Sequence, residues 1–243
     1  MSRTVPHLFL LLTMLFTACA PQVTIEDTEA DLQEFGLPPL PVEERYIIAV
    51  PDFEVRAGSV KVGQVDLSSE GDSFYRELGA GVADIFLTEA FRSARFRITE
   101  RGELDQIVRE QNLAQSGRID PGTAADVGRI TGAQLIVLGS LSEFGITTTG
   151  GGGRVLGIFG GSTETVTARA TVDIRMVDAV TAEVLAIGHA TSEVSQSNIS
   201  IDVGNVLRAL RAGRSGTTIV DLAVRNAIRG AIREAARGLP PKP

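Results

Sequence analysis

The side chains best suited to covalent or metal chemistry are few in this chain: one cysteine, Cys19, and two histidines, His7 and His189. A thiol or imidazole that acts as nucleophile, base or metal ligand needs partners around it, and the sequence shows no such set. The run Gly150–Gly153 invites comparison with a phosphate-binding loop, but no Gly-Lys-Ser/Thr follows it. The sequence therefore predicts a binding or structural protein without metal or cofactor, not an enzyme.

Cys19 is most informative through the residues that precede it. A basic residue, Arg3, comes before the apolar run Leu8–Phe16, and small residues lead into the cysteine. This order is typical of a secretory signal peptide, and the run is shorter than the about 20 residues that span a bilayer. Residues 16–19, Phe-Thr-Ala-Cys, resemble a bacterial lipobox, which predicts removal of residues 1–18 and lipidation of the Cys19 thiol. The alternative is a soluble secreted protein with an incidental cysteine.

The predicted anchor also sets the compartment. Ala20 stands where an aspartate usually signals retention at the inner membrane, so the sequence resembles an outer-membrane address. We therefore expect a lipid-anchored chain on the periplasmic side of the outer membrane of a Gram-negative bacterium. Residues 19–44 are rich in proline and carboxylates and predict an extended tether before a folded domain over 45–243. The net charge of −7 argues against nucleic acid as a partner.

Hydrophobic periodicity predicts an α/β or α+β domain, of which we favour the α+β class. The segment Val55–Asp72 mixes glycine, serine and charged residues and predicts a long loop. Leu104, Ile107 and Val108 are the predicted inward face of the second helix. The expected strands and helices are, in order, Tyr46–Val50, Phe74–Ala94, Phe96–Ile98, Glu103–Leu113, Asp120–Gly132, Leu135–Phe144, 163–176, 184–203 and Thr217–Ala236.

One predicted strand alternates strictly between apolar and polar side chains. Val166, Ala168, Ala170 and Val172 fall on one face, and Thr165, Thr167, Arg169 and Thr171 fall on the other. A period of two with one polar face predicts a strand that buries one face only. Because residues 163–176 exceed the usual strand length of about 5–6 residues, we expect this strand to outgrow the sheet of a soluble domain.

Several segments, taken in their order, resemble the CsgG/HfaB family of outer-membrane lipoproteins. They are Phe91–Phe96, Glu100–Glu110, Ile130–Ser140, and the hairpin Gly152–Met176 with the turn Val177–Glu183 after it. The resemblance extends from about Tyr46 to the final helix, and none of these segments is a catalytic signature. It implies an α/β sandwich in the periplasm that carries two long β-hairpins.

The resemblance implies a function as well as a fold. Such proteins form homo-oligomeric rings in which each subunit inserts two β-hairpins into the outer membrane, closing one shared transmembrane barrel. The pore passes unfolded subunits of curli-like fibres or of a surface adhesin by diffusion, with a periplasmic accessory cap as a further partner. In this chain the hairpins are expected at about 143–175 and 189–217, with membrane lipid against Val166, Ala168, Ala170 and Val172.

The family's channel is narrowed by aromatic and amide side chains between its first strand and first helix. Phe74 and Tyr75 fall near the aromatic position, so the resemblance implies a constriction at these two residues. The alternative is that both residues simply start the helix and pack inward.

A different function can use the same α/β body without a pore. Lipoproteins that activate cell-wall synthases, and some flagellar accessory proteins, resemble it but lack hairpins long enough to span a membrane. The first predicted hairpin is long enough, because each membrane strand needs about 9–11 residues. The second is a poor lipid-facing pair, because one face carries Gln196, Asn198, Ser200 and Asp202. The sequence therefore leaves a secretion pore and a periplasmic binding module open.

Overall fold

The computed structural model describes residues 35–62, 67, 70–102, 104–116, 118, 120, 122, 130–151, 163–197, 205, 208, 211–212 and 219–243. The predicted signal peptide, Cys19 and most of the tether 19–44 lie outside these residues, as does most of the predicted helix Asp120–Gly132. In the part of the chain that is described, no helix is both long enough and apolar enough to cross a membrane.

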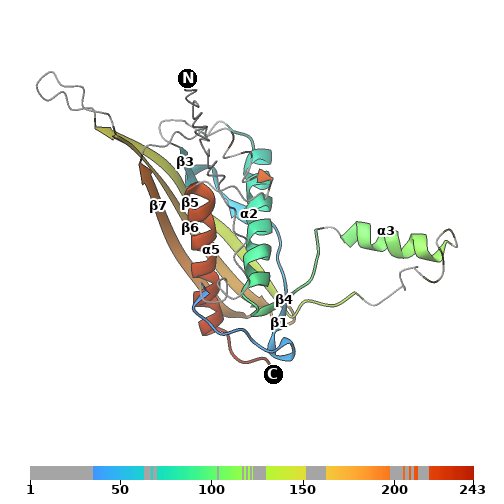
Figure 1. The fold of residues 1–243 in the computed structure, drawn as a ribbon. Helices are drawn as coiled ribbons and strands as arrows, with labels where there is room; N and C mark the ends of the chain where they lie inside the picture. Colours follow the sequence, from blue (N-terminus) through green and yellow to red (C-terminus); the bar gives the residue numbers. More distant parts are fainter. Residues whose placement is uncertain are drawn as a thin grey trace, which may run out of the picture.

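A seven-stranded mixed sheet forms the centre of the fold, in the order β4-β1-β5-β6-β7, with β2 and β3 also paired to β5. β1, β2 and β3 follow one another along the same side of β5, all parallel to it, whereas β6 and β7 continue the sheet in antiparallel pairs. The predicted α+β class is thus confirmed (Figure 1). The strands are β1 Tyr46–Ala49, β2 Glu54–Val55, β3 Val60–Val62, β4 Phe96–Ile98, β5 Leu135–Gly151, β6 Thr163–Asp178 and β7 Val184–Ser197.

Two long helices, α2 (Asp72–Arg92) and α5 (Ile219–Gly238), cover one face of the sheet (Figure 1). α5 packs on β6 and β7, and α2 lies beside it against β2, β4 and β5. A set of apolar residues recurs every three or four positions along α5, from Val220 to Ala235, and this set is buried, whereas Leu222 lies on the exposed side of the helix. The core therefore lies between the sheet and this pair of helices. Short 3-10 helices, η1 (Val42–Glu44) and η2 (Ala57–Ser59), precede β1 and β3.

Small residues allow α5 to lie very close to β7. A Cβ on Gly188 of β7 would lie 2.0 Å from the carbonyl oxygen of Ala231, and a Cβ on Gly230 would lie 2.6 Å from the Cβ of Ala190. Real Cβ atoms do not approach other atoms so closely, so a side chain at either glycine would push the helix off the strand.

The segment Val55–Asp72, predicted as a loop, contains β3 and the end of β2. The reason is the length of β5, which continues well beyond its pairing with β1 and offers free backbone groups to short segments. Glu54 pairs with Ser140, and Val60 pairs with Phe144 and is buried in the core. Pairing of this kind depends on a distant strand and leaves little trace in the local sequence.

Helix α3 (Leu104–Gln115) projects away from the sheet (Figure 1). The prediction of a helix here is confirmed, but the prediction that Leu104, Ile107 and Val108 point into the core is wrong, because no residue of α3 is buried. Ile107 and Val108 are each 38% exposed. The amphipathic pattern is present, yet no element of the described chain covers its apolar side.

β5 and β6 form the first predicted hairpin. Their pairing runs from Leu135 with Asp178 to Gly151 with Thr163, so the hairpin extends beyond the predicted range 143–175. β5 also joins the hairpin to the parallel side of the sheet, which means that the hairpin is continuous with the body of the domain (Figure 1).

The second predicted hairpin, 189–217, differs from the structure. Its first arm is part of β7, which pairs with β6 along nearly its whole length. On the returning arm, the described residues Asn205, Arg208 and Arg211 are helical, so the strand predicted there is wrong at these positions. Leucine, arginine and alanine dominate that arm, and these residue types favour a helix.

Candidate functional site

The strands β5, β6 and β7 carry the residues that the resemblance assigned to the membrane. Val166, Ala168, Ala170 and Val172 are 2%, 0%, 0% and 0% exposed, and α5 packs on the strand that bears them. In this conformation the face predicted to meet lipid is therefore part of the core. The alternation showed that one face is buried, and a helix can bury such a face as well as a bilayer can.

The opposite face of the same strands is polar and, apart from the buried Thr171, partly or fully exposed from Thr165 to Arg175. Hydroxyl groups join β6 to β7 across this face, in the pairs Thr165–Ser197 at 3.0 Å, Thr167–Ser195 at 2.8 Å and Thr171–Thr191 at 2.9 Å between oxygens. The three pairs follow the strand register, so they form a ladder of hydroxyls along the hairpin. This ladder is a hydrogen-bonding surface rather than a packing surface.

Arg169 ties the three strands together on this polar face. Its Nε lies 3.1 Å from Glu143 of β5, and its Nη1 lies 3.4 Å from Glu193 of β7. The hydrogen bond to Glu143 and the negative charge of that carboxylate, assisted by Glu193, raise the pKa of Arg169. All three side chains are about half exposed, so the triplet fixes strand register more than it stabilises the fold.

His189, which appears isolated in the sequence, has a partner in the fold. Its Nδ1 lies 2.6 Å from a carboxylate oxygen of Asp173, and its backbone amide donates to the Glu234 carboxylate of α5 at 2.6 Å. Burial raises the pKa of Asp173, but hydrogen bonds from Ser142 and His189 outweigh it and lower the pKa overall. The Asp173 carboxylate lies between the Ser142 hydroxyl and the His189 imidazole. A serine nucleophile is activated when the imidazole lies between the hydroxyl and the carboxylate, which is a different order.

The same face offers no metal site of the usual kind. Within the described residues, no group of three or more His, Cys, Asp or Glu side chains is placed to hold a metal ion.

The register explains the pairing of His189, because it sets Asp173 directly opposite His189 on neighbouring strands. β6 and β7 are joined by the turn Asp178–Glu183, and counting residues outward from this turn along both strands could have suggested that Asp173 and His189 pair.

Phe74 and Tyr75, the predicted constriction residues, lie in the first turn of α2 and are 7% and 6% exposed. Their rings meet edge to face with centroids 5.1 Å apart, and the Tyr75 hydroxyl donates to the carbonyl oxygen of Leu67. The Arg211 guanidinium lies 5.2 Å from the Phe74 ring centroid. In the single chain both aromatic residues therefore pack inward at the start of the helix, as in the alternative interpretation.

A buried ionic cluster, made of Glu89, Asp221, Arg225 and Arg229, joins α2 to α5. Glu89 is fully buried; its carboxylate accepts from Nη1 of Arg225 at 2.5 Å and from Nε of Arg229 at 2.7 Å. Asp221 accepts from Nε of Arg225 at 3.0 Å. Burial lowers the pKa of Arg225, but the two carboxylates outweigh it and raise the pKa overall. Sequence reasoning missed this cluster, although an acidic residue on the apolar face of α2 is a signal for it.

Sequence comparison places the chain among known proteins. The family model described as curli production assembly/transport component CsgG matches residues 30–240. The chain belongs to the CsgG family. The match includes nearly all of the predicted domain 45–243 and confirms the resemblance expected from the sequence segments. No curated protein matches the chain in sequence.

Three solved structures are similar to this CsgG-family chain at low identity. The hypothetical protein CT253 from Chlamydia trachomatis is 15% identical, with a TM-score of 0.38 over 80% of this chain and 97% of that one. Lipoprotein GNA1162 from Neisseria meningitidis is 12% identical, with a TM-score of 0.31 over 69% and 93%. The PelC dodecamer from Paraburkholderia phytofirmans is 13% identical, with a TM-score of 0.30 over 81% and 92%.

Proposed function

We propose that this CsgG-family chain is a lipid-anchored outer-membrane protein whose copies assemble into a ring, and that the ring forms a pore. The pore passes unfolded subunits of a curli-like fibre or surface adhesin, with a periplasmic accessory cap as a further partner. Transport is diffusive and involves no enzyme chemistry. The observation that carries this proposal is the β5–β6 hairpin.

The hairpin meets the demands that a membrane barrel makes on a strand pair. β5 has 17 residues and β6 has 16, whereas a membrane strand needs about 9–11. The side chains of β6 alternate between an apolar face and the hydroxyl ladder. In a closed barrel the apolar face would meet lipid, and the ladder would line a water-filled lumen.

Insertion requires α5 to leave the hairpin, because α5 now covers the apolar face of β6. A single inserted hairpin would leave backbone groups unpaired in hydrocarbon, where no water can satisfy them. Release of α5 and closure of the ring must therefore be coupled. In this proposal the described conformation is that of the subunit before insertion.

A second candidate function is favoured by specific observations: the apolar face of β6 is covered, and Asn205, Arg208 and Arg211 are helical where the second membrane hairpin was expected. In this function the chain stays in the periplasm as a non-pore binding module of cell-envelope assembly, of the cell-wall synthase activator or flagellar accessory type. Its free surfaces would then be α3 and the polar face of β5, β6 and β7.

Single-channel recording separates the two functions. Lipidated protein extracted in detergent is added to a planar bilayer, and stepwise, stable conductances are expected from the pore. A Thr167→Cys variant should lose conductance when a charged, water-soluble thiol reagent is added, because Thr167 belongs to the ladder that would line the lumen. The matched Val166→Cys variant should be insensitive, because its side chain would face lipid.

Each result has a definite meaning. Conductance that is blocked at position 167 and not at 166 supports the pore and its assigned faces. Absence of conductance from intact oligomeric protein contradicts the pore and favours the periplasmic module. Conductance that responds equally at both positions contradicts the hairpin assignment.

A further inference from the structure

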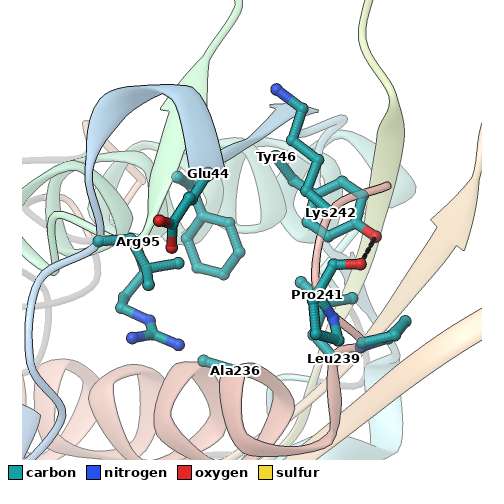
Figure 2. Close-up of a pocket in the computed structure, with 10 residues that line it drawn as sticks. Glu44, Tyr46, Arg95, Ala236, Leu239, Pro241 and Lys242 are labelled. Carbon is teal, nitrogen blue, oxygen red and sulfur yellow. Dashed lines mark hydrogen bonds between the residues drawn. The ribbon is translucent and has the colours of Figure 1, made fainter.

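A pocket of about 330 Å³ lies at the end of the sheet where β1 and β4 begin, beside the C-terminal tail (Figure 2). Its apolar wall is made by Leu40, Phe96, Ala236 and Leu239. The pocket is therefore built from three parts of the chain that are far apart in sequence: the segment before β1, the start of β4, and the residues that end and follow α5. Its volume is at the lower end of the about 300–1,000 Å³ found for small-molecule sites.

The pocket is held together by contacts of the C-terminal tail. The Tyr46 hydroxyl donates to the carbonyl oxygen of Pro241 at 3.3 Å, and Lys242 Nζ donates to the carbonyl oxygen of Glu43 at 3.0 Å. Figure 2 shows the first of these contacts along one side of the pocket, with Arg95 on the opposite side. The walls are thus fixed by the chain itself.

Arg95 has hydrogen-bonding capacity that the chain does not use. Its Nη1 donates to the carbonyl oxygen of Pro38 at 2.8 Å, but its Nε is buried and has no partner. A guanidinium can grip a carboxylate with two parallel hydrogen bonds, and Arg95 is among the residues that line the pocket. Burial lowers the pKa of Arg95, which reflects the cost of keeping its charge in this place. In Figure 2 the guanidinium lies beside Ala236 at the pocket wall.

We infer that this pocket binds a carboxylate carried on a short apolar tail. The carboxylate pairs with the Arg95 guanidinium where this residue lines the pocket, and the tail lies against the wall formed by Phe96 and Leu239. Nothing in this inference depends on the proposed pore.

The charges around the pocket set the class of ligand more narrowly. Arg95 and Lys242 bring positive charges to the pocket and Glu44 brings a negative one, so the excess of a single positive charge matches a group with one negative charge better than a phosphate monoester with two. A single carboxylate is therefore favoured over phosphate. Such a group has two natural sources, a fatty acid and the C-terminal end of a peptide with apolar side chains.

Isothermal titration of the mature chain tests the inference with three probes: octanoate, N-acetyl-leucyl-leucine and the neutral octanamide. We expect one of the two carboxylates to bind saturably and octanamide to bind at least about tenfold more weakly. Preference for octanoate identifies a fatty acid as the source, and preference for the dipeptide identifies a peptide end. Equal binding of octanamide, or no saturable binding of either carboxylate, overturns the inference.

Variants assign the binding to Arg95. Arg95→Gln should weaken the carboxylate about tenfold or more, and Glu44→Gln should strengthen it, because a repelling charge is removed. Arg97→Gln is the matched control, since Arg97 lies only two residues further along the chain, in β4, but is exposed and does not line the pocket. Each variant is first checked for a cooperative thermal transition. Unchanged affinity in a folded Arg95→Gln protein overturns the assignment.

Discussion

Glu89 is the residue on which the contact between α2 and α5 depends most. It has no exposed surface, and both of its carboxylate oxygens accept from arginines of α5. Buried ion pairs add little net stability compared with apolar packing, but removal of one partner leaves the other charge buried without compensation. Loss of one member of the cluster should therefore destabilise the fold, and the cluster fixes which surfaces of α2 and α5 meet.

Glu89→Gln should lower the free energy of unfolding by about 3–5 kcal/mol, because two arginines lose their shared negative charge. Urea unfolding of the variant and the parent measures this difference. Arg56→Gln is the control, since it breaks an exposed pair with Glu54 and should leave the unfolding midpoint unchanged. A Glu89→Gln protein as stable as its parent would show that the cluster does not hold the helices together.

Asp178 gives the turn between β6 and β7 a dependence on pH. Its carboxylate accepts from the backbone amides of Val180 and Thr181, both at 2.8 Å, and these hydrogen bonds lower its pKa. A group whose pKa is lowered in the folded state stabilises the turn at neutral pH, and that contribution is lost as pH falls through the folded pKa. The loss lies below the ordinary aspartate pKa of about 3.9.

The amide signals of Val180 and Thr181 should therefore shift together with acid, with a midpoint below about 3.9. A two-dimensional NMR titration measures this midpoint. In Asp178→Ala the shift should disappear from both amides. A midpoint at or above the ordinary aspartate value would contradict the assigned hydrogen bonds.

At the scale of the elements, the contact of α5 with β7 helps to keep the helix over the apolar face of the β5–β6 hairpin. Gly188→Ala would place a Cβ against the Ala231 carbonyl oxygen and should destabilise the fold by about 1–3 kcal/mol. Gly132→Ala is the control, because no atom lies within 4 Å of the Cβ position at Gly132. Thermal unfolding measures both variants.

The same substitution discriminates between the two proposed functions. If the pore forms after α5 leaves the sheet, Gly188→Ala should increase insertion into vesicles at temperatures where the protein stays folded. If the chain is a periplasmic module, the variant should lose stability without any gain in membrane association. Flotation of vesicles with bound protein distinguishes these outcomes.

Most elements could be predicted because their signals are local. β1, β4, α2, β6 and α5 follow from apolar runs and from periods of two or near four, and the hairpin follows from the spacing of its strands. The sequence does not reveal which element, or which solvent, covers each apolar face. The alternation at Val166–Val172 fits a helix or a bilayer equally well, and the small residues that favour the helix, Gly188 and Gly230, lie elsewhere in the chain.

The candidate site was predicted less completely than the fold. The hydroxyl ladder follows from the same alternation, because Thr165 and Thr167 share the polar face. The pairing of His189 with Asp173 and the burial of Glu89 both join segments that are distant in sequence. The wrong placement of Ile107 on α3 has the same origin, since an amphipathic helix reveals that it has an apolar side but not what covers that side.

At the scale of the whole molecule, the proposed lipid anchor at Cys19 would determine where the chain works. If Cys19 is lipidated as proposed, Cys19→Ser should release the mature protein from membranes into the soluble periplasmic fraction, because the acyl chains would supply the binding energy, about 0.8 kcal/mol per buried CH₂. Fractionation and immunoblotting measure the release, and surface export of the substrate should be lost with it. Membrane retention of Cys19→Ser would contradict the predicted lipidation.

The hydrogen bond between Glu234 and the His189 amide has a consequence for how the free subunit behaves in solution. Among the described strands the sheet ends at β7, and this carboxylate occupies a main-chain donor on that strand. A strand from another molecule cannot add there without displacing it, so the free subunit resists growth into open fibrils of its own. Glu234→Ala should therefore precipitate at a lower concentration than the parent, as light scattering would show. A protein proposed to export fibre subunits would in this way be protected from forming fibrils itself.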